Sequence, residues 1–241
     1  MKRLSKHASN CPEFPDRCCL SSALWEHKSD SVVLMAIDFK KVQKDLYQPK
    51  TTPAVVNVPS MVYIAVDGQG DPNTSEEYAA AIEMLYGLSY TIKMGNTSVL
   101  EWVVGPLEGL WSIDGNPQTS VVSVTDKDKY VWTALIRQPD FVNQDFFETA
   151  RIQLAKKKRN LDLSRVRLQT IKEGLCVQIL HTGPYDAEPE TVAVLDQFAL
   201  DNGYILDLSS TRRHHEIYLS DPRRTSPDKL KTVIRHPIRR S

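Results

Sequence analysis

The stretch His214–Pro222 holds the residues whose types and spacing best suit chemistry. Its central residues are good strand formers, and Asp221-Pro222 would end the strand because proline has no N–H for the ladder. Side chains alternate along a strand, so His214, Glu216 and Tyr218 are expected on one face. A carboxylate on a half-buried sheet face needs a partner, which is either another side chain or a ligand.

Two kinds of chemistry are open to Glu216. If it is ionised in a pocket walled by aromatic rings, it would attract a cationic or polarised aromatic ligand. If it is partly desolvated, its pKa would rise and it would serve as a general base for water. Tyr185 or Tyr218 would then donate a hydrogen bond to a developing oxyanion. The alternative without function is a salt bridge to Arg212 or Arg213.

The rest of the chain predicts the elements that would position this acid. Apolar residues at helical spacing predict helices at about 76–93, 143–159 and 189–202. Alternating or β-branched runs predict strands at 54–58, 61–66, 99–104, 129–136, 166–171, 175–181, 214–219 and 230–235.

The order of these elements repeats. Strand, glycine turn, helix, strand, strand occurs at about 50–140 and again at about 165–238, and an Ile-Arg-X-Pro motif closes each copy. Two copies related by a pseudo-twofold axis would form an α+β fold with one antiparallel sheet, helices on one face and a ligand cleft on the other. Glu101 takes the place of Glu216 in the first copy, so both are expected at mirror positions in the cleft.

The composition is that of an ordinary soluble globular protein of 241 residues. Lys+Arg 30 and Asp+Glu 30 cancel, which removes the electrostatic footprint of a nucleic-acid-binding protein. No apolar run reaches the ~20 residues of a membrane span, and the N-terminus has no secretory apolar segment. Adjacent His214 and His215 would point to opposite faces, so no metal site is expected. We therefore expect a cytoplasmic protein without direct nucleic-acid or membrane binding.

Residues 1–34 differ from the rest of the chain. They lack helical or strand periodicity and contain three of the four cysteines, a distribution that indicates a reducing compartment rather than a disulfide scaffold. Met35 opens a run typical of the start of a compact protein. We interpret 1–34 as a disordered extension or a start-site artefact, and 35–241 as a single domain.

Several motifs together resemble the GyrI-like small-molecule-binding family, in its stand-alone branch without a DNA-binding domain. They are Asp67–Pro72, Trp132-Thr133, Ile136–Pro139, Gly174–Gln178, Gly183–Asp186 and His214–Pro222. The resemblance covers about residues 35–238 and implies a duplicated module with a ligand cleft between its halves. In the related effector-binding domains of AraC-type and MerR-type regulators, a buried glutamate meets bulky, often cationic aromatic drugs. By position, that role falls on Glu216.

The resemblance also implies two alternative functions. Some stand-alone relatives hydrolyse strained cyclopropane rings in DNA-alkylating natural products. A protein of this kind would bind bulky planar xenobiotics and detoxify the reactive ones without a cofactor. The alternative is a non-catalytic module that sequesters small molecules or modulates a protein partner. The sequence does not distinguish the two functions, because both need the same acid in the same aromatic cleft.

Aromatic residues are the expected walls of the cleft. Trp132 shares its predicted face with Tyr130, and Trp111 lies in a loop that could form a lid, although tryptophan is more often a core residue. Tyr185 follows a Gly-Pro turn, where it either faces a ligand or caps the sheet edge. The candidate catalytic residues are thus Glu216 and Tyr185, and the candidate ligand contacts are Tyr218, Trp132, Trp111, Tyr130, Tyr86, Tyr90, His214 and Glu101.

Overall fold

The structure is a computed structural model. It describes residues 36–96, 101–114, 116 and 127–241. These residues belong to one compact unit, Leu34–Ser241. The interpretation of 1–34 as a disordered extension concerns residues outside the described ones.

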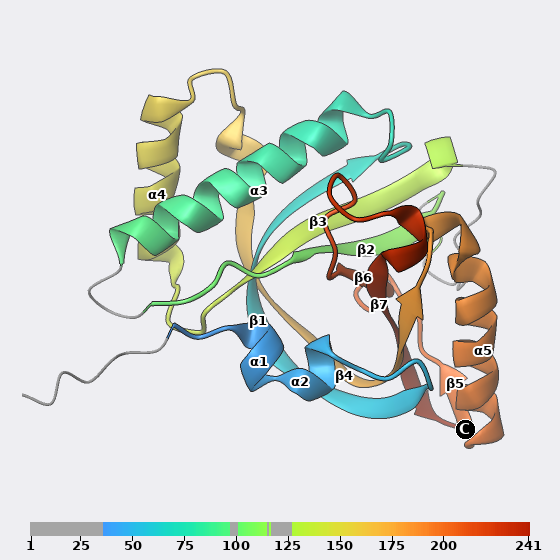
Figure 1. The fold of residues 1–241 in the computed structure, drawn as a ribbon. Helices are drawn as coiled ribbons and strands as arrows, with labels where there is room; N and C mark the ends of the chain where they lie inside the picture. The colour runs from blue at the N-terminus through green and yellow to red at the C-terminus, as the bar shows by residue number, and fades with distance from the viewer. Residues whose placement is uncertain (1–35, 97–100, 115, 117–126) are drawn as a thin grey trace, which may run out of the picture. The chain divides into compact units, whose positions relative to one another are not determined.

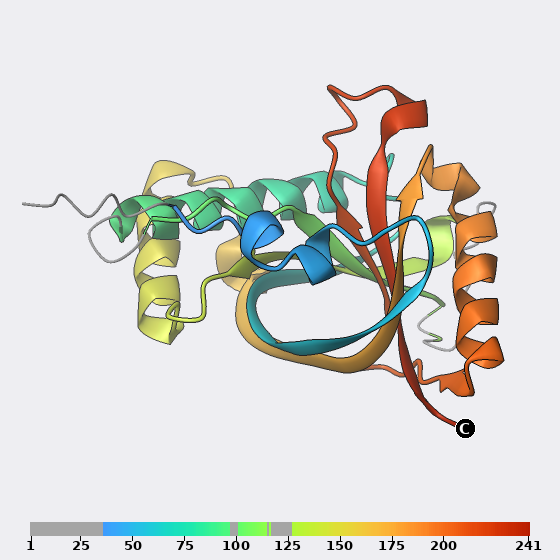
Figure 2. The same cartoon turned by 60° about the horizontal axis from the view of Figure 1, so that its bottom comes forward.

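The described strands form an antiparallel sheet that closes on itself. The order β4-β1-β3-β2-β6-β7 returns to β4 because β4 also pairs with β7, and β5 pairs with the far end of β7. Figures 1 and 2 show β1 and β4 curving together around the closed part. The strands are β1 (Ala54–Gln69), β2 (Leu107–Ile113), β3 (Tyr130–Gln138), β4 (Arg167–Thr182), β5 (Tyr204–Leu206), β6 (His214–Tyr218) and β7 (Lys231–Arg240).

Three longer helices pack on the outside of this sheet (Figure 1). α3 (Glu76–Gly95) contacts β1, β3 and the helix α4 (Gln144–Lys157), while α5 (Glu188–Asp201) contacts β4, β5 and β7. In the part of the chain that the structure describes, no helix is long and apolar enough to cross a membrane.

Local sequence explains where the helices begin. The side chain of Ser75 accepts a hydrogen bond from the backbone N–H of Tyr78 at the start of α3, and Asn143 caps α4 in the same way. Figure 2 shows two short helices that the sequence did not predict, α1 (Phe39–Val42) and α2 (Lys44–Tyr47), beside the curved strands. Their buried residues Phe39, Leu46 and Tyr47 belong to the interior cluster of the closed sheet.

The predicted duplication is confirmed. The first copy consists of β1, α3, β2 and β3, and the second of β4, α5, β6 and β7. β1 pairs with β4, and β2 pairs with β6, so the two copies meet along two antiparallel contacts. The α+β class and the antiparallel sheet are therefore as predicted.

The strand predicted at 99–104 is wrong in position. Among its described residues, Trp102 forms an isolated bridge to Ile37, and the strand is β2, which follows Gly105-Pro106 instead of ending there. The cause is tertiary, because β2 is held between β3 and β6. The two short strands predicted within 54–66 are one continuous strand, β1. Those predicted within 166–181 are likewise one strand, β4.

Closure of the sheet gives it an inside and an outside with separate packing. Outside, α3 covers a cluster that includes Ile64, Trp132 and Leu85. Inside, Met61 and Leu135 belong to a second cluster. Because side chains alternate along each strand, neighbouring residues serve different clusters.

A charged network is buried inside the closed sheet. The Nδ1 atom of His215 lies 3.0 Å from Glu173 Oε1, and its Nε2 lies 3.0 Å from Glu108 Oε2 in an ion pair. Arg235 donates to the other oxygen of Glu173 at 2.7 Å, and Tyr47 donates to Glu108 at 3.2 Å. Burial lowers the pKa of His215, but the two carboxylates outweigh it and raise the pKa to about 9. The imidazole is therefore charged at neutral pH.

We predict that His215→Gln removes a pH-dependent part of the stability. Because the pKa of His215 is higher in the folded protein than its unfolded value of 6.5, its stabilisation is complete below that value and is lost as the pH rises through about 9. The wild type should therefore lose on the order of 3 kcal/mol of unfolding free energy across this window. Urea unfolding at about pH 6 and pH 9.5 measures the loss, which should be much smaller in the variant.

His181→Gln is the matched control. His181 is also buried, but its ring nitrogens meet the Thr191 hydroxyl at 2.8 Å and the Pro184 carbonyl at 3.2 Å, which are neutral groups. This variant should keep the wild-type dependence on pH. The same dependence in His215→Gln would contradict the assignment of the charge to His215.

Candidate functional site

A cavity of about 970 Å³ lies between α3, the start of α5 and the outward faces of β2, β3 and β6. This volume is at the upper end of the range for small-molecule sites. The sequence placed the cleft opposite the helices, whereas side chains of α3 and α5 line this cavity. The residues predicted for the site that line it are Glu216, Tyr185, Tyr218, Trp111, Tyr130, Tyr86, Tyr90 and His214.

Aromatic rings form much of the wall. Trp111 lies 5.9 Å from Tyr78 and 5.6 Å from Tyr130 between ring centroids, and Tyr185 meets Tyr218 edge-on at 5.7 Å. Tilted and edge-to-face pairs of this kind hold the rings in fixed orientations and offer apolar faces to a planar ligand.

Glu216 lies at the floor of the cavity, with 5% of its surface exposed. Its Oε1 lies 2.8 Å from His214 Nε2, and its Oε2 accepts a hydrogen bond of 2.6 Å from the Tyr218 hydroxyl. The Tyr218 oxygen accepts a hydrogen bond of 3.0 Å from Trp111 Nε1 in turn. One face of β6 thus carries His214, Glu216 and Tyr218, as predicted. The hydrogen bonds from His214 and Tyr218 hold the Glu216 carboxyl in place.

The alternative of a salt bridge between Glu216 and a neighbouring arginine does not occur. Arg212 pairs with Asp207 and donates to backbone carbonyls of β4. Arg213 donates to the Thr133 hydroxyl. Both guanidinium groups are used elsewhere, which leaves the carboxyl to the cavity.

The pKa of Glu216 is shifted in the direction opposite to the one expected for a general base. Burial does raise its pKa, but the hydrogen bond and charge of His214 and the hydrogen bonds of Tyr218 and Glu188 outweigh burial, so the pKa is lowered. Glu216 is therefore ionised at neutral pH. It is a base that is always available but has reduced affinity for a proton.

Sequence reasoning missed Glu188, the first residue of α5. It lines the cavity, is 6% exposed, and lies beside the carboxyl of Glu216. Burial and then the charge of Glu216 raise the pKa of Glu188 well above its usual range. The two carboxyls therefore hold one proton between them. An acid at a helix start is ordinarily explained by the helix dipole, so no separate signal in the sequence points to Glu188.

Behind Glu216 runs a chain of buried hydrogen bonds. His214 Nδ1 lies 2.6 Å from His236 Nε2, and His236 Nδ1 lies 2.6 Å from Asp196 Oδ1 on α5. Burial lowers the pKa of His236, and His214 lowers it further against the opposing effect of Asp196. The chain fixes the orientation of the imidazole that holds Glu216.

Trp132 lies behind the cavity wall rather than in it. Its side chain is fully buried and packs edge-on against Tyr78, with 4.9 Å between ring centroids. Trp132 is therefore a core residue rather than a ligand contact. Tyr90 is at the rim, 53% exposed and stacked on Tyr86 with 6.4 Å between centroids.

Glu101 is not brought to the cavity. It is exposed and precedes β2, with a backbone oxygen that accepts from the N–H of Ile37. The strand register shows why Glu101 is not the counterpart of Glu216. In the second copy, Glu216 on β6 pairs with Ile234 on β7. Ile136 on β3 is the residue of the first copy that corresponds to Ile234, and it pairs with Leu107 on β2. The counterpart of Glu216 is thus apolar.

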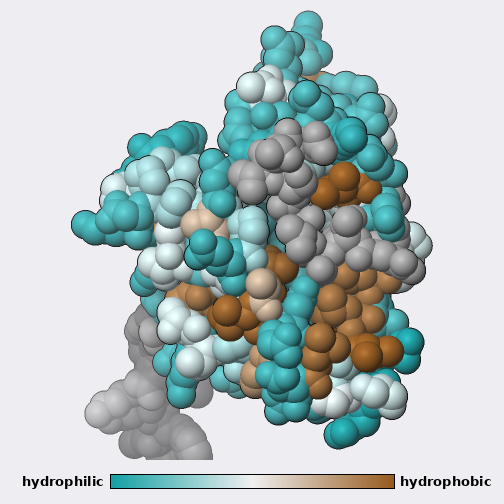
Figure 3. Space-filling view, turned by 90° about the vertical axis from the view of Figure 1, so that its right-hand side faces the viewer, coloured by the Kyte–Doolittle hydropathy of each residue, from teal (hydrophilic) through white to brown (hydrophobic). Residues whose placement is uncertain are grey.

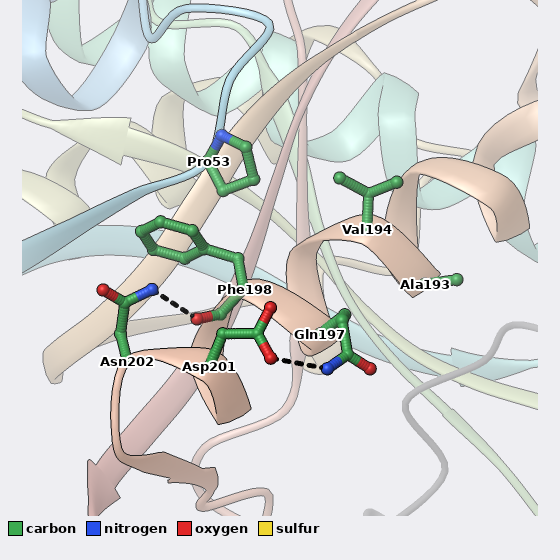
Figure 4. A pocket seen from close by; sticks show the side chains of 7 residues that line it. All are labelled: Pro53, Ala193, Val194, Gln197, Phe198, Asp201 and Asn202. Atoms are coloured by element: carbon green, nitrogen blue, oxygen red, sulfur yellow. Dashed lines mark hydrogen bonds between the residues drawn. The ribbon is translucent and has the colours of Figure 1, made fainter.

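A second hollow lies on the surface of α5 and carries no comparable chemistry. Figure 3 faces the side that bears α5 and shows apolar side chains among hydrophilic ones. In Figure 4, Gln197 donates to Asp201 and Asn202 donates to the Phe198 carbonyl, so the polar groups bond within the helix and its end. The residues that line this second hollow are Pro53, Ala193, Val194, Gln197, Phe198, Asp201 and Asn202.

Comparisons with known proteins agree with this geometry. The family described as GyrI-like small molecule binding domain matches residues 51–239. A crystal structure of an uncharacterized conserved protein from Listeria innocua is 44% identical, with a TM-score of 0.79, over 84% of this chain and 100% of that one. A crystal structure of a hydrolase from the same organism is 42% identical, with a TM-score of 0.76, over 84% and 100%. A comparison with curated proteins gives no match.

We predict that Tyr218→Phe raises the pKa of Glu216. The variant removes a hydrogen-bond donor to the carboxylate and the acceptor of the Trp111 N–H, which should also cost about 1–3 kcal/mol of stability. NMR titration of ¹³C-labelled glutamate carboxyls measures the first effect, and thermal unfolding measures the second. Tyr185→Phe is the control, because that ring packs on Tyr218 without a hydrogen bond to Glu216 among the described contacts. Unchanged titration in Tyr218→Phe would contradict the role of this hydroxyl.

Proposed function

The chain belongs to the GyrI-like small-molecule-binding family, and from that premise we propose that it binds bulky planar aromatic compounds and hydrolyses those with a strained, electrophilic cyclopropane ring. The observation that carries this proposal is the carboxyl of Glu216, held in fixed orientation at the floor of an aromatic cavity. Destruction of such DNA-alkylating compounds would be a detoxification.

The walls of the cavity support the binding step. Rings from α3, β2, β3, β6 and the turn before α5 surround a space large enough for several fused rings. Burying aromatic surface between them supplies affinity that does not depend on one exact ligand structure.

The position of Glu216 supports the hydrolytic step. The oxygen of a water molecule forms a bond to a ring carbon, the ring C–C bond breaks, and its electron pair enters the conjugated carbonyl of the substrate. Glu216 takes the proton that the water loses, and solvent delivers a proton to the carbonyl oxygen. Glu216 then releases its proton to solvent, so the net reaction adds one water to the substrate. The relative from Listeria innocua that is 42% identical is described as a hydrolase, which supports a reaction of this class.

One observation favours binding without turnover as a second candidate function. Both oxygens of Glu216 already have partners, His214 and Tyr218, and these partners lower its pKa. A carboxylate of reduced basicity is better suited to fixing a ligand than to removing a proton from water. The protein would then sequester its ligand or modulate a partner protein.

We predict that Glu216→Gln abolishes turnover and retains binding. The substitution keeps the shape of the side chain but removes its basicity, so hydrolysis should fall about 10²–10⁴-fold. Mass spectrometry of a cyclopropane-bearing DNA alkylator incubated with the protein detects the water adduct, and fluorescence quenching measures binding. Glu101→Gln, an exposed residue away from the cavity, should match the wild type. Stoichiometric binding without adduct in the wild type would favour sequestration.

A further inference from the structure

Gly109 lies in the middle of β2, opposite the acid of the candidate site. In the strand register it pairs with Glu216 on β6 and with Ala134 on β3. Glycine inside a strand weakens the strand and often marks a place where another group approaches the backbone closely. The φ angle of Gly109 is not in the left-handed region, so the backbone conformation does not require glycine here. What the position requires is space.

The indole ring of Trp111 fills that space. A Cβ atom added at position 109 would lie 2.9 Å from Cε2 of the indole and closer still to its Nε1, and contacts this short do not occur unless one group moves. The ring has little room to move, because Trp111 is 4% exposed and contacts the rings of Tyr78 and Tyr130. Even the methyl group of alanine at position 109 would therefore displace the indole.

Only an indole that lies across Gly109 can reach Tyr218. In the register of β2 and β6, Trp111 pairs with His214. The pair formed by Gly109 and Glu216 comes between that pair and Tyr218. The indole nevertheless donates its N–H to the Tyr218 oxygen at 3.0 Å, and the Tyr218 hydroxyl donates to Glu216 at 2.6 Å. Hydrogen bonds in such a chain polarise one another, so the indole N–H strengthens the hydrogen bond that Glu216 receives.

We infer that Gly109 is a positioning residue for Glu216. It leaves the space in which Trp111 lies, and Trp111 in turn directs the Tyr218 hydroxyl to the carboxyl. Gly109 has no side chain to offer a ligand, so it acts through these two residues. Trp111 thereby has a second role besides that of an aromatic wall. The value of this arrangement for turnover rests on the proposed function, whereas the arrangement itself can be tested without a ligand.

Titratable groups from several neighbouring elements face Glu216. They are His214 and Tyr218 on β6, His236 on β7, Tyr78 on α3, Tyr130 on β3, Tyr185 in the turn before α5, and Glu188 on α5. The single N–H of the Trp111 indole goes to Tyr218. A change at Gly109 that weakens this link takes away stabilisation from the charged form of Glu216, so it should raise the pKa of that carboxyl.

Gly109→Ala tests the inference in the full-length protein. The added methyl group should move the indole away from Tyr218, so the titration midpoint of Glu216 should shift to higher pH, towards its value in Tyr218→Phe. NMR of ¹³C-labelled glutamate carboxyls measures this shift, and the indole N–H signal of Trp111 should at the same time lose its protection from exchange with solvent. Gly95→Ala is the matched control, because a Cβ atom at position 95 meets nothing within 4 Å, and it should match the wild type in both measurements.

Trp111→Leu removes both the indole N–H and the ring that a side chain at position 109 would meet. The Glu216 midpoint should again shift to higher pH. Gly109→Ala added to Trp111→Leu should shift the midpoint no further, and it should lower the melting temperature less than it does in the wild type, because leucine leaves room for the methyl group. If Gly109→Ala alone does not fold, the double variant should still fold wherever Trp111→Leu does.

The outcomes that would overturn the inference are specific to it. An unchanged Glu216 midpoint in folded Gly109→Ala or Trp111→Leu would do so, as would a Trp111 indole N–H that exchanges freely with solvent in the wild type. Equal destabilisation by Gly109→Ala in both backgrounds would place the steric conflict elsewhere. None of these measurements uses a ligand, so they leave the proposed function to the adduct assay, and failure of that assay would leave the role of Gly109 in place.

Discussion

The alternation of side chains along β6 is the constraint on which both the fold and the site depend. His215 points into the closed sheet, where it pairs with Glu108 and Glu173. His214 and Glu216 point outward, to the cavity. A slip of one residue in the register of β6 would place the cavity acid in the core and expose the interior imidazole. The buried ion pairs of His215 oppose such a slip, and so they also keep Glu216 where it is.

Duplication builds the cavity but does not make it symmetric. The two copies supply corresponding helices and strands, and their contact along β2 and β6 forms part of the cavity wall. At the position where the second copy has Glu216, the first copy has Leu107, because each pairs with the corresponding isoleucine of the next strand. One copy therefore carries the polar chemistry, and the other contributes mainly surface for packing, including Trp111. Of these two corresponding strand positions, only the one in the second copy carries an acid.

How much the sequence could predict depends on the range of the interaction. Local patterns suffice for the face shared by His214, Glu216 and Tyr218, for the helix caps and for the order of elements. Register between distant strands does not follow from them, and Glu101 was misplaced for that reason. Glu188 was missed on similar grounds, since only the packing of α5 against β4 and β7 brings it beside Glu216. The cleft was assigned to the wrong face because no pattern in the strands shows which face the sheet closes around.

Buried glutamates are ionised in the interior network, whereas one of the two at the cavity floor keeps a proton, and the ratio of acids to bases explains the difference. Inside the sheet, His215 and Arg235 together face Glu173, and they lower the pKa of that carboxyl to about 2 despite burial. At the cavity floor, His214 faces Glu216 alone, so a second carboxyl at Glu188 finds no cation and keeps its proton. In the interior, the charged groups face one another in ion pairs rather than a cavity. The cavity floor has one carboxyl in excess, so Glu188 and Glu216 hold one proton between them at the cavity wall. This excess is the physical difference between the two networks.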